Sequence, residues 1–341
     1  MRLAGALLAL SVVSGAAAQS EPQFHLPVRC EVGRTCYVQN HVDIDPSPAA
    51  RDFSCGSLTY DGHNGTDFRL PDMAAQRSGV DVLAAAPGRV LRVRANVPDQ
   101  SVRLTSREAV QGAECGNGLV IDHGAGWETQ YCHMARSSIP VRPGHTVETG
   151  QVLGRVGLSG LTEYPHLHFT VRQDGKVIDP FSFGAPAGSC GEGRSLWAEA
   201  VADQLRYKPT VVLNFGFTDA PPSLDSVEEG SLRAVTNNAP ALIAYVRVIG
   251  LRAGDTQQLT YEARPDAFSP SVALSRWSAT RHSLSPSSVG GGRQASGRRG
   301  DTKASMRCGV MATLSSKRGS RWKCQAYDDE RGRLHTFTRC R

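Results

Sequence analysis

Residues 166–171 read HLHFTV, and this short stretch decides the fold prediction. Side chains of a strand alternate between its faces, so His166 and His168 are expected on one face and the apolar residues of the stretch on the other, toward a core. Two imidazoles on one rigid face suit a metal site. Two surface histidines on a solvated face would give the same spacing, so the stretch by itself leaves both interpretations open.

Around this stretch, residues 59–185 read as short strands separated by turns that contain glycine, which predicts an antiparallel sheet. The expected strands cover residues 80–85, 89–95, 119–123, 128–134, 151–156 and 166–171. Farther along, residues 190–275 are expected to form a small, mostly β accessory region that begins with a helix over 195–208. Its expected strands cover residues 210–217, 242–249 and 257–263.

A second candidate motif reads HNGTDF and begins at His63. Asn-Gly favours a turn, so His63 and Asp67 are expected to meet where a loop enters a strand. Imidazole and carboxylate are both zinc ligands. His41 and Asp45 have the same spacing, but they lie in an acidic stretch flanked by proline and lack the glycine turn. We therefore favour His63 and Asp67.

A third motif, YCHM, lies at the end of the expected strand over residues 128–134. Alternation along that strand predicts that Tyr131 and His133 share a face. A single histidine on a strand is more often structural than catalytic. His133 is therefore a candidate only in combination with the other two motifs.

Composition and charge place the chain among globular proteins. Of its 341 residues 40% are hydrophobic and 21% charged, which allows a substantial core. The net charge of +6 is unevenly distributed, because residues 276–341 hold 15 Lys and Arg against 4 Asp and Glu. This basic, low-complexity tail has no periodicity and is expected to be disordered. Two interpretations of this tail remain open. It is either a basic arm that contacts acidic polymers or the product of a shifted reading frame. No nucleic-acid motif accompanies it, so no nucleic-acid partner is expected.

The N-terminus has the layout of a secretory signal peptide. Residues 1–18 contain one early charge, an apolar run and small residues near the end. The alternative, a membrane anchor, needs roughly 20 apolar residues, and this run is shorter. We therefore expect cleavage near residue 18 and no membrane span in the rest of the chain.

Nine cysteines in an exported chain indicate disulfides. Cys30 and Cys36 are expected to close a short loop in the lead segment, residues 19–58. Cys115 and Cys132 flank a predicted hairpin and form a second candidate pair.

Read in order, the motifs resemble those of the lysostaphin-type (LytM-type) zinc metallopeptidases over about residues 60–182. The sequence runs HNGTD, GVDVLAAAPGRVLRV, GNGLVIDHGAGWETQYCHM, VRPGHTVETGQVLGRVGLSG and then HLHFTV followed by IDP. The resemblance implies a mainly β fold, a two-layer antiparallel β-sheet metallopeptidase domain over residues 59–185. A long insertion from about residue 96 to 116 departs from the family pattern and bears on specificity.

The same resemblance implies one zinc ion bound by His63, Asp67 and His168. The family's two further histidines act on the catalytic water and match His133 and His166. Three protein ligands leave a fourth zinc position open for water, whose pKa zinc lowers to about 7. The sequence has no HExxH helix, so a histidine is expected to act as the base.

The implied function is that of an exported zinc metalloendopeptidase, periplasmic or extracellular. By resemblance, it would use a zinc-activated water to hydrolyse amide bonds in the peptide cross-links of bacterial peptidoglycan. One alternative is a non-catalytic scaffold of the same fold that binds cell wall or activates an amidase. A second alternative is a peptidase that cleaves proteins. The complete ligand set favours the enzyme over the scaffold, and the sequence does not separate the two substrates.

Overall fold

The computed structural model describes residues 21–235, 243–251, 256–263, 277–282, 287–291, 308–315, 321–328 and 334–340. The expected signal peptide, residues 1–18, lies outside this part of the chain. Within it, no helix combines the length and apolar character that crossing a bilayer requires.

An eight-stranded antiparallel sheet forms the first half of the protein, and its strands follow the order β1-β2-β9-β6-β5-β4-β7, with β10 paired to β9. The bounds are β1 Tyr37–Asn40, β2 Thr66–Arg69, β4 Gly88–Arg94, β5 Asn117–Gly124, β6 Trp127–Met134, β7 Thr146–Val147, β9 His166–Gln173 and β10 Lys176–Ile178. A separate pair, β3 Asp81–Leu83 and β8 Val152–Arg155, completes this half. The prediction of a mainly β, antiparallel fold is confirmed.

Strand β9 lies in the interior of the sheet, between β2 and β6. Its apolar residues Leu167, Phe169 and Val171 are buried, whereas His166 and His168 are partly exposed. The alternation expected from HLHFTV is therefore observed: one face of β9 packs into the core and the other carries the histidines.

Two aromatic residues from opposite ends of this half complete its core. Phe24 forms a parallel bridge with Trp197, and both side chains are buried. Their rings lie edge-on at 6.4 Å, and each also contacts the ring of Phe169. The lead segment and the segment after the sheet therefore enclose the β core together.

The helices are short. Helix α1 spans Met73–Ser78 and starts at Asp72, whose side chain accepts a hydrogen bond from the Ala75 N–H. Helix α2, Glu199–Ala202, lies inside the expected helix but is much shorter. Helix α3, Leu224–Glu228, begins with a capping box at Ser223, and a 3₁₀ turn spans Glu108–Val110.

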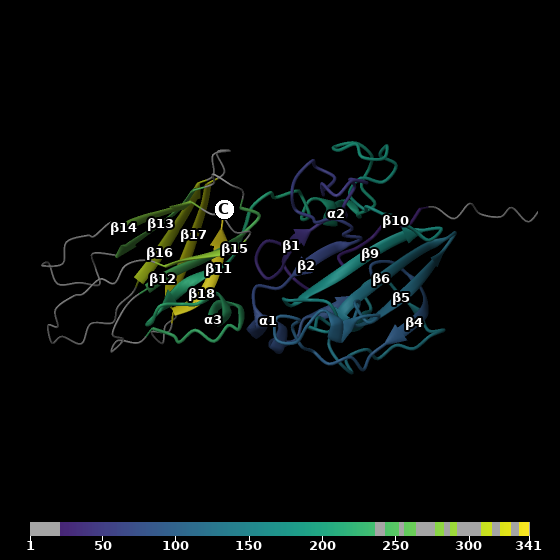
Figure 1. Cartoon of the computed structure of the whole chain (residues 1–341), viewed down its shortest axis with the longest axis horizontal. Coiled ribbons are helices and arrows are strands. Elements are labelled where there is room, and N and C mark those ends of the chain that lie inside the picture. Colours follow the sequence, from purple (N-terminus) through teal and green to yellow (C-terminus); the bar gives the residue numbers. More distant parts are fainter. Residues whose placement is uncertain are drawn as a thin grey trace, which may run out of the picture.

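The second half of the protein contains two further sheets, which Figure 1 shows as a separate body beside the first. One has the order β11-β12-β15 and the other β14-β13-β16-β17-β18. The bounds are β11 Val211–Thr218, β12 Ile243–Ile249, β13 Thr256–Ala263, β14 Trp277–His282, β15 Ser287–Gly291, β16 Cys308–Ser315, β17 Arg321–Asp328 and β18 Leu334–Cys340.

Strands β14 to β18 lie within residues 276–341, where we expected disorder. That expectation does not hold for these strands. The expectation was based on composition, which indicates how much apolar surface a segment can bury by itself. Composition carries no information about hydrogen bonding to a strand elsewhere in the chain. Here β14 and β16 pair with β13, and β15 pairs with β12, so the accessory region supplies the sheet edges to which these strands add. Strands β17 and β18 then extend the sheet from β16.

Both predicted disulfides are present, Cys30–Cys36 and Cys115–Cys132. A third bond, Cys55–Cys190, joins residues 135 positions apart and was not predicted. It connects the lead segment to the chain that follows the sheet.

Candidate metal centre

Two adjacent strands and one turn bring the three expected metal ligands together. Asp67 on β2 lies directly opposite His168 on β9 in the antiparallel register. The distance from Asp67 Oδ1 to His168 Nδ1 is 2.8 Å, and the distance from Asp67 Oδ2 to His63 Nε2 is 3.2 Å. One potential ligand atom from each of His63, Asp67 and His168 lies within 4.8 Å of the other two. Two imidazoles and one carboxylate form a donor set that suits zinc and leaves one tetrahedral position open.

Each of these side chains is also held by an outer partner. His63 Nδ1 lies 2.7 Å from the backbone carbonyl of His41, and Asn40 Nδ2 donates to Asp67 Oδ2 at 2.8 Å. His168 Nε2 lies 3.0 Å from Asn64 Oδ1. Such partners fix the tautomer and orientation of metal ligands. They leave Nε2 of His63 and Nδ1 of His168 directed at Asp67, and hence available to an ion.

The electrostatics of the site favour an ionised Asp67. Burial raises its pKa, but His63 and His166 lower it more, together with hydrogen bonds from His168 and His63, so the pKa lies well below its usual range. For His63, burial lowers the pKa, and the charge and hydrogen bond of Asp67 raise it more. A carboxylate among imidazoles supplies the negative charge that a divalent cation requires.

The other two predicted residues, His133 and His166, lie beside this group. Their ring centroids are 4.7 Å apart, and the His133 ring is 5.9 Å from that of His168. Nδ1 of His133 lies 2.8 Å from the Ser159 carbonyl, and Nδ1 of His166 lies 2.9 Å from the Tyr164 carbonyl. Donation from each Nδ1 to a carbonyl leaves each Nε2 without a proton and able to accept one.

Burial favours the neutral form of both of these rings. It lowers the pKa of His133 well below the usual value, with His166 and His168 adding to the effect. Burial also lowers the pKa of His166, although Asp67 opposes the shift. Neutral imidazoles are the form that can act as bases near neutral pH.

His133 reaches the site by an irregularity in β6. It has a positive φ of 61°, and the β5–β6 register shifts between Asn117 and Leu119, opposite this point. Tyr131 instead lies in the core, where its ring is 5.3 Å from that of Phe169. The expectation that Tyr131 and His133 share a face is therefore wrong, because a β-bulge reverses the alternation between them.

Several supporting residues were not predicted. Asn40 lies 27 positions before Asp67, and the Ser159 and Tyr164 carbonyls act through the backbone, which carries no sequence signal. His41, which we set aside together with Asp45, contributes its carbonyl to His63 while its own ring packs among Phe53, Phe181 and Tyr207.

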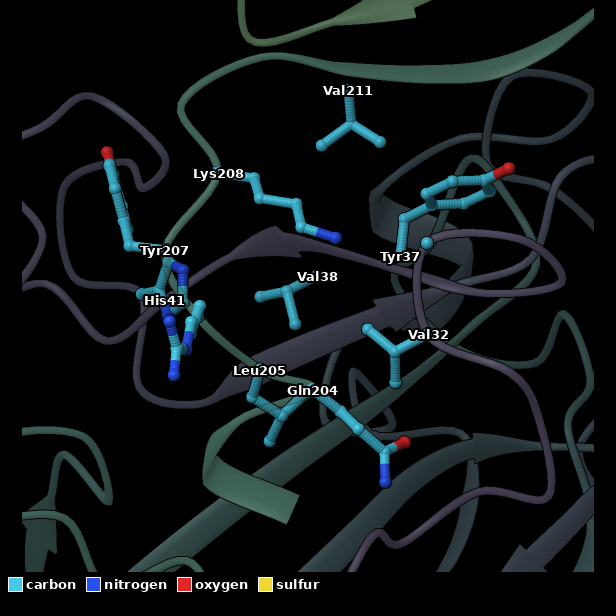
Figure 2. A pocket seen from close by; sticks show the side chains of 11 residues that line it. Val32, Tyr37, Val38, His41, Gln204, Leu205, Tyr207, Lys208 and Val211 are labelled. Carbon is cyan, nitrogen blue, oxygen red and sulfur yellow. The ribbon is translucent and has the colours of Figure 1, made fainter. Parts of the chain in front are cut away.

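A separate pocket lies between β1 and the segment that leads from α2 to β11 (Figure 2). Its lining is largely apolar and includes Val38, Leu205 and Val211. None of the five predicted site residues lines it, although His41 does. The candidate metal centre and this pocket are therefore distinct, and His41 lines the pocket while its carbonyl contacts His63.

The part of the chain that contains these five residues matches a known peptidase family. Residues 61–180 match the model of peptidase family M23. Peptidoglycan DD-endopeptidase ShyB of Vibrio cholerae is 31% identical over 124 residues, which cover 36% of this chain and 24% of that protein. Peptidoglycan DD-endopeptidase ShyA of the same organism is 32% identical over 127 residues, covering 37% of this chain and 24% of that protein.

Among solved structures, a mutant catalytic domain of the prophage-encoded M23 protein EnpA from Enterococcus faecalis aligns with a TM-score of 0.29 and 25% identity. The alignment covers 42% of this chain and 98% of that one. Residues 61–180 are therefore similar to M23, or LytM-type, peptidases. The chain spans about a quarter of the length of the two curated relatives named above.

Proposed function

We propose that this protein is an exported zinc metalloendopeptidase that hydrolyses amide bonds in the peptide cross-links of bacterial peptidoglycan. The observation that carries the proposal is the convergence of five side chains from β2, β6, β9 and the turn before β2. Three of them offer ligand atoms to one ion, and two present unprotonated imidazole nitrogens beside it. The names of the M23 relatives ShyA and ShyB support the choice of peptidoglycan as substrate.

His63, Asp67 and His168 would hold the zinc ion. When bound there, zinc polarises a substrate carbonyl and brings the pKa of water to about 7. His133 and His166 would take the proton from the attacking water at Nε2 and deliver it to the leaving amine. The carbonyls of Ser159 and Tyr164 hold the opposite edge of each ring, which keeps the accepting nitrogen directed at the site.

Export is proposed on two grounds. The sequence of residues 1–18 has the layout of a signal peptide. Three disulfides, among them Cys55–Cys190, suit a protein that matures in an oxidising compartment. A periplasmic or extracellular location would also give the site access to cell wall.

The decisive experiment is digestion of purified peptidoglycan by the zinc-loaded protein, with the His168→Ala variant as control. Mass spectrometry of the released fragments should show new amine termini at peptide cross-links, and the control should release none. Absence of cleavage by folded, zinc-containing protein would refute the proposal and favour a wall-binding scaffold. Cleavage of denatured protein substrates without cleavage of peptidoglycan would instead identify a protein-directed peptidase.

A further inference from the structure

We propose that helix α3 of the accessory region is a positioning element for the peptidase site. Through Arg69 and Arg103, its two acidic residues Asp225 and Glu228 hold the Tyr164 segment in place, and this segment orients His166. The inference rests on the proposed function in assigning His166 a role in proton transfer. The contacts from helix α3 to His166 are observed in the structure and do not depend on that role.

The first contact is a buried ionic cluster around Glu228. Arg69 on β2 donates from Nη2 to Glu228 Oε2 at 2.6 Å, and Arg247 on β12 donates from Nη1 to the same oxygen. All three residues are at most 6% exposed. Arg247 also donates to the Pro71 carbonyl, and Arg69 donates to Gln39. A shared carboxylate in a buried place fixes both guanidinium groups and ties two sheets together.

The second step leads from Arg69 to Tyr164. The guanidinium carbon of Arg69 lies 4.0 Å from the centre of the Tyr164 ring, within the range of a cation–π contact. Arg103, from the insertion over residues 96–116, lies 5.9 Å from the same ring. Its Nη2 donates to Asp225 Oδ1 at 2.7 Å. Asp225 and Glu228 are three residues apart and therefore neighbours on the helix surface. Each binds an arginine that reaches Tyr164.

The third step leads from Tyr164 to His166. The Tyr164 carbonyl accepts the hydrogen bond from Nδ1 of His166 at 2.9 Å, and Thr162 Oγ1 lies 3.1 Å from the same nitrogen. His166 also lies opposite Arg69 in the β2–β9 register. A shift of Arg69 or Tyr164 would therefore turn the imidazole and move Nε2 relative to Asp67, from which it is now 3.5 Å away.

The residue that follows helix α3 offers a matched control. Glu229 follows Glu228 directly, and it pairs with Arg77 of α1 at 3.4 Å on the surface. Both members of that pair are about half exposed. The pair joins the same two halves of the protein but does not involve Tyr164. Comparing substitutions at Glu228 and Glu229 therefore distinguishes two effects. One is the loss of a contact that positions His166, and the other is a weaker attachment of the accessory region to the sheet.

The test compares Glu228→Gln and Tyr164→Leu with Glu229→Gln, all in the full-length, zinc-loaded protein. The first two variants should retain stoichiometric zinc and lose about tenfold in kcat, the lower range for an outer partner. Their His166 ring resonances, observed in histidine-labelled protein by NMR, should move. Glu229→Gln should keep both properties at the wild-type level, as expected for a surface ion pair.

Tyr164→Leu protects the test against misfolding, because Glu228→Gln leaves two buried arginines without a carboxylate. Unchanged His166 resonances in folded Tyr164→Leu protein would overturn the inference, as would equal changes in Glu229→Gln. Failure of the wild-type protein to cleave peptidoglycan would instead refute the proposed function. The NMR comparison decides the positioning role in either case, since it needs no substrate.

Discussion

Tyr131 and His133 lie two residues apart on β6, yet their side chains point to opposite faces of the sheet. Tyr131 packs in the core, and its hydroxyl accepts a hydrogen bond from the Ala85 N–H at 2.9 Å. His133 faces the candidate metal centre because its backbone adopts a φ of 61°. This left-handed conformation is uncommon for residues other than glycine and is typical of functional sites. One strand therefore supplies both a core anchor and a site residue.

Substitution of individual histidines should separate metal binding from proton transfer. His168→Ala removes a ligand atom, so zinc and activity should be lost together. His166→Ala leaves the ligand set intact, so zinc should remain while activity falls by at least about a hundredfold, the range for a general acid–base group. Zinc content by atomic absorption and hydrolysis of peptidoglycan measure the two effects. Loss of zinc from His166→Ala would contradict this division of roles.

Gly65→Ala should weaken zinc binding through direct contact. A Cβ at this position would lie 2.7 Å from Nε2 of His168 and 2.8 Å from the Phe169 carbonyl. The ring of His168 must move to relieve the clash, so we expect about a tenfold loss of zinc affinity. Gly62→Ala is the control, because no atom lies within 4 Å there. Its φ of +75° predicts a cost of about 1–2 kcal/mol in stability and unchanged zinc affinity. Competition with a chromogenic chelator measures both affinities.

Asn40→Ala should also reduce zinc affinity, although Asn40 is not a ligand. Its amide holds Oδ2 of Asp67, so its loss frees the carboxylate to rotate. Outer partners of this kind are worth about 10–100-fold in affinity, and we expect the lower end. Asn214→Ala, which removes a partly buried amide that contacts Pro71 instead, should have no effect on zinc. Equal affinities for wild type and Asn40→Ala would show that Asp67 needs no such support.

Asp179 should make stability depend on pH. Burial raises its pKa to about 7, and its Oδ2 has no hydrogen-bond partner. Because the folded pKa lies above the unfolded value of about 4, the stabilising contribution is complete below pH 4 and is lost as the pH rises through 7. The loss is at most about 4 kcal/mol, from three pKa units.

Asp179→Asn should therefore be more stable than wild type at pH 8, with the advantage shrinking toward pH 4. Unfolding in urea at several pH values measures this difference, with chelator present so that pH-dependent metal binding does not contribute to stability. If the difference in unfolding free energy between wild type and Asp179→Asn stayed constant across pH 4–8, Asp179 would not titrate as inferred.

The sequence predicted the strands near the site well, because alternation is a local property. HLHFTV gave both the core face and the histidine face of β9, and every expected strand from 80–85 to 257–263 has an observed counterpart. The register between strands was harder to predict from the sequence. The pairing of Asp67 with His168 depends on strands 101 residues apart, and no local pattern encodes it. Only the resemblance to a family joined those residues in advance.

The remaining features depend on backbone conformation or on distant burial. The bulge at His133 requires a positive φ that Cys-His-Met does not signal. Glu228 and Arg247 are ordinary charged residues in the sequence, and their burial beside Arg69 appears only when two sheets meet. Composition likewise predicted disorder for a tail in which β14, β15 and β16 pair with β12 or β13.

The bridge between Phe24 and Trp197 bears on how this protein could be fused to other proteins. Both residues lie outside the family match at 61–180, yet their rings pack on Phe169 inside the β core. A graft limited to the matched segment would carry the five candidate site residues and expose the apolar surface that Phe24 and Trp197 cover. The smallest segment expected to keep its core when fused to another protein therefore extends from the lead segment to helix α2. Fusion junctions should lie outside these limits.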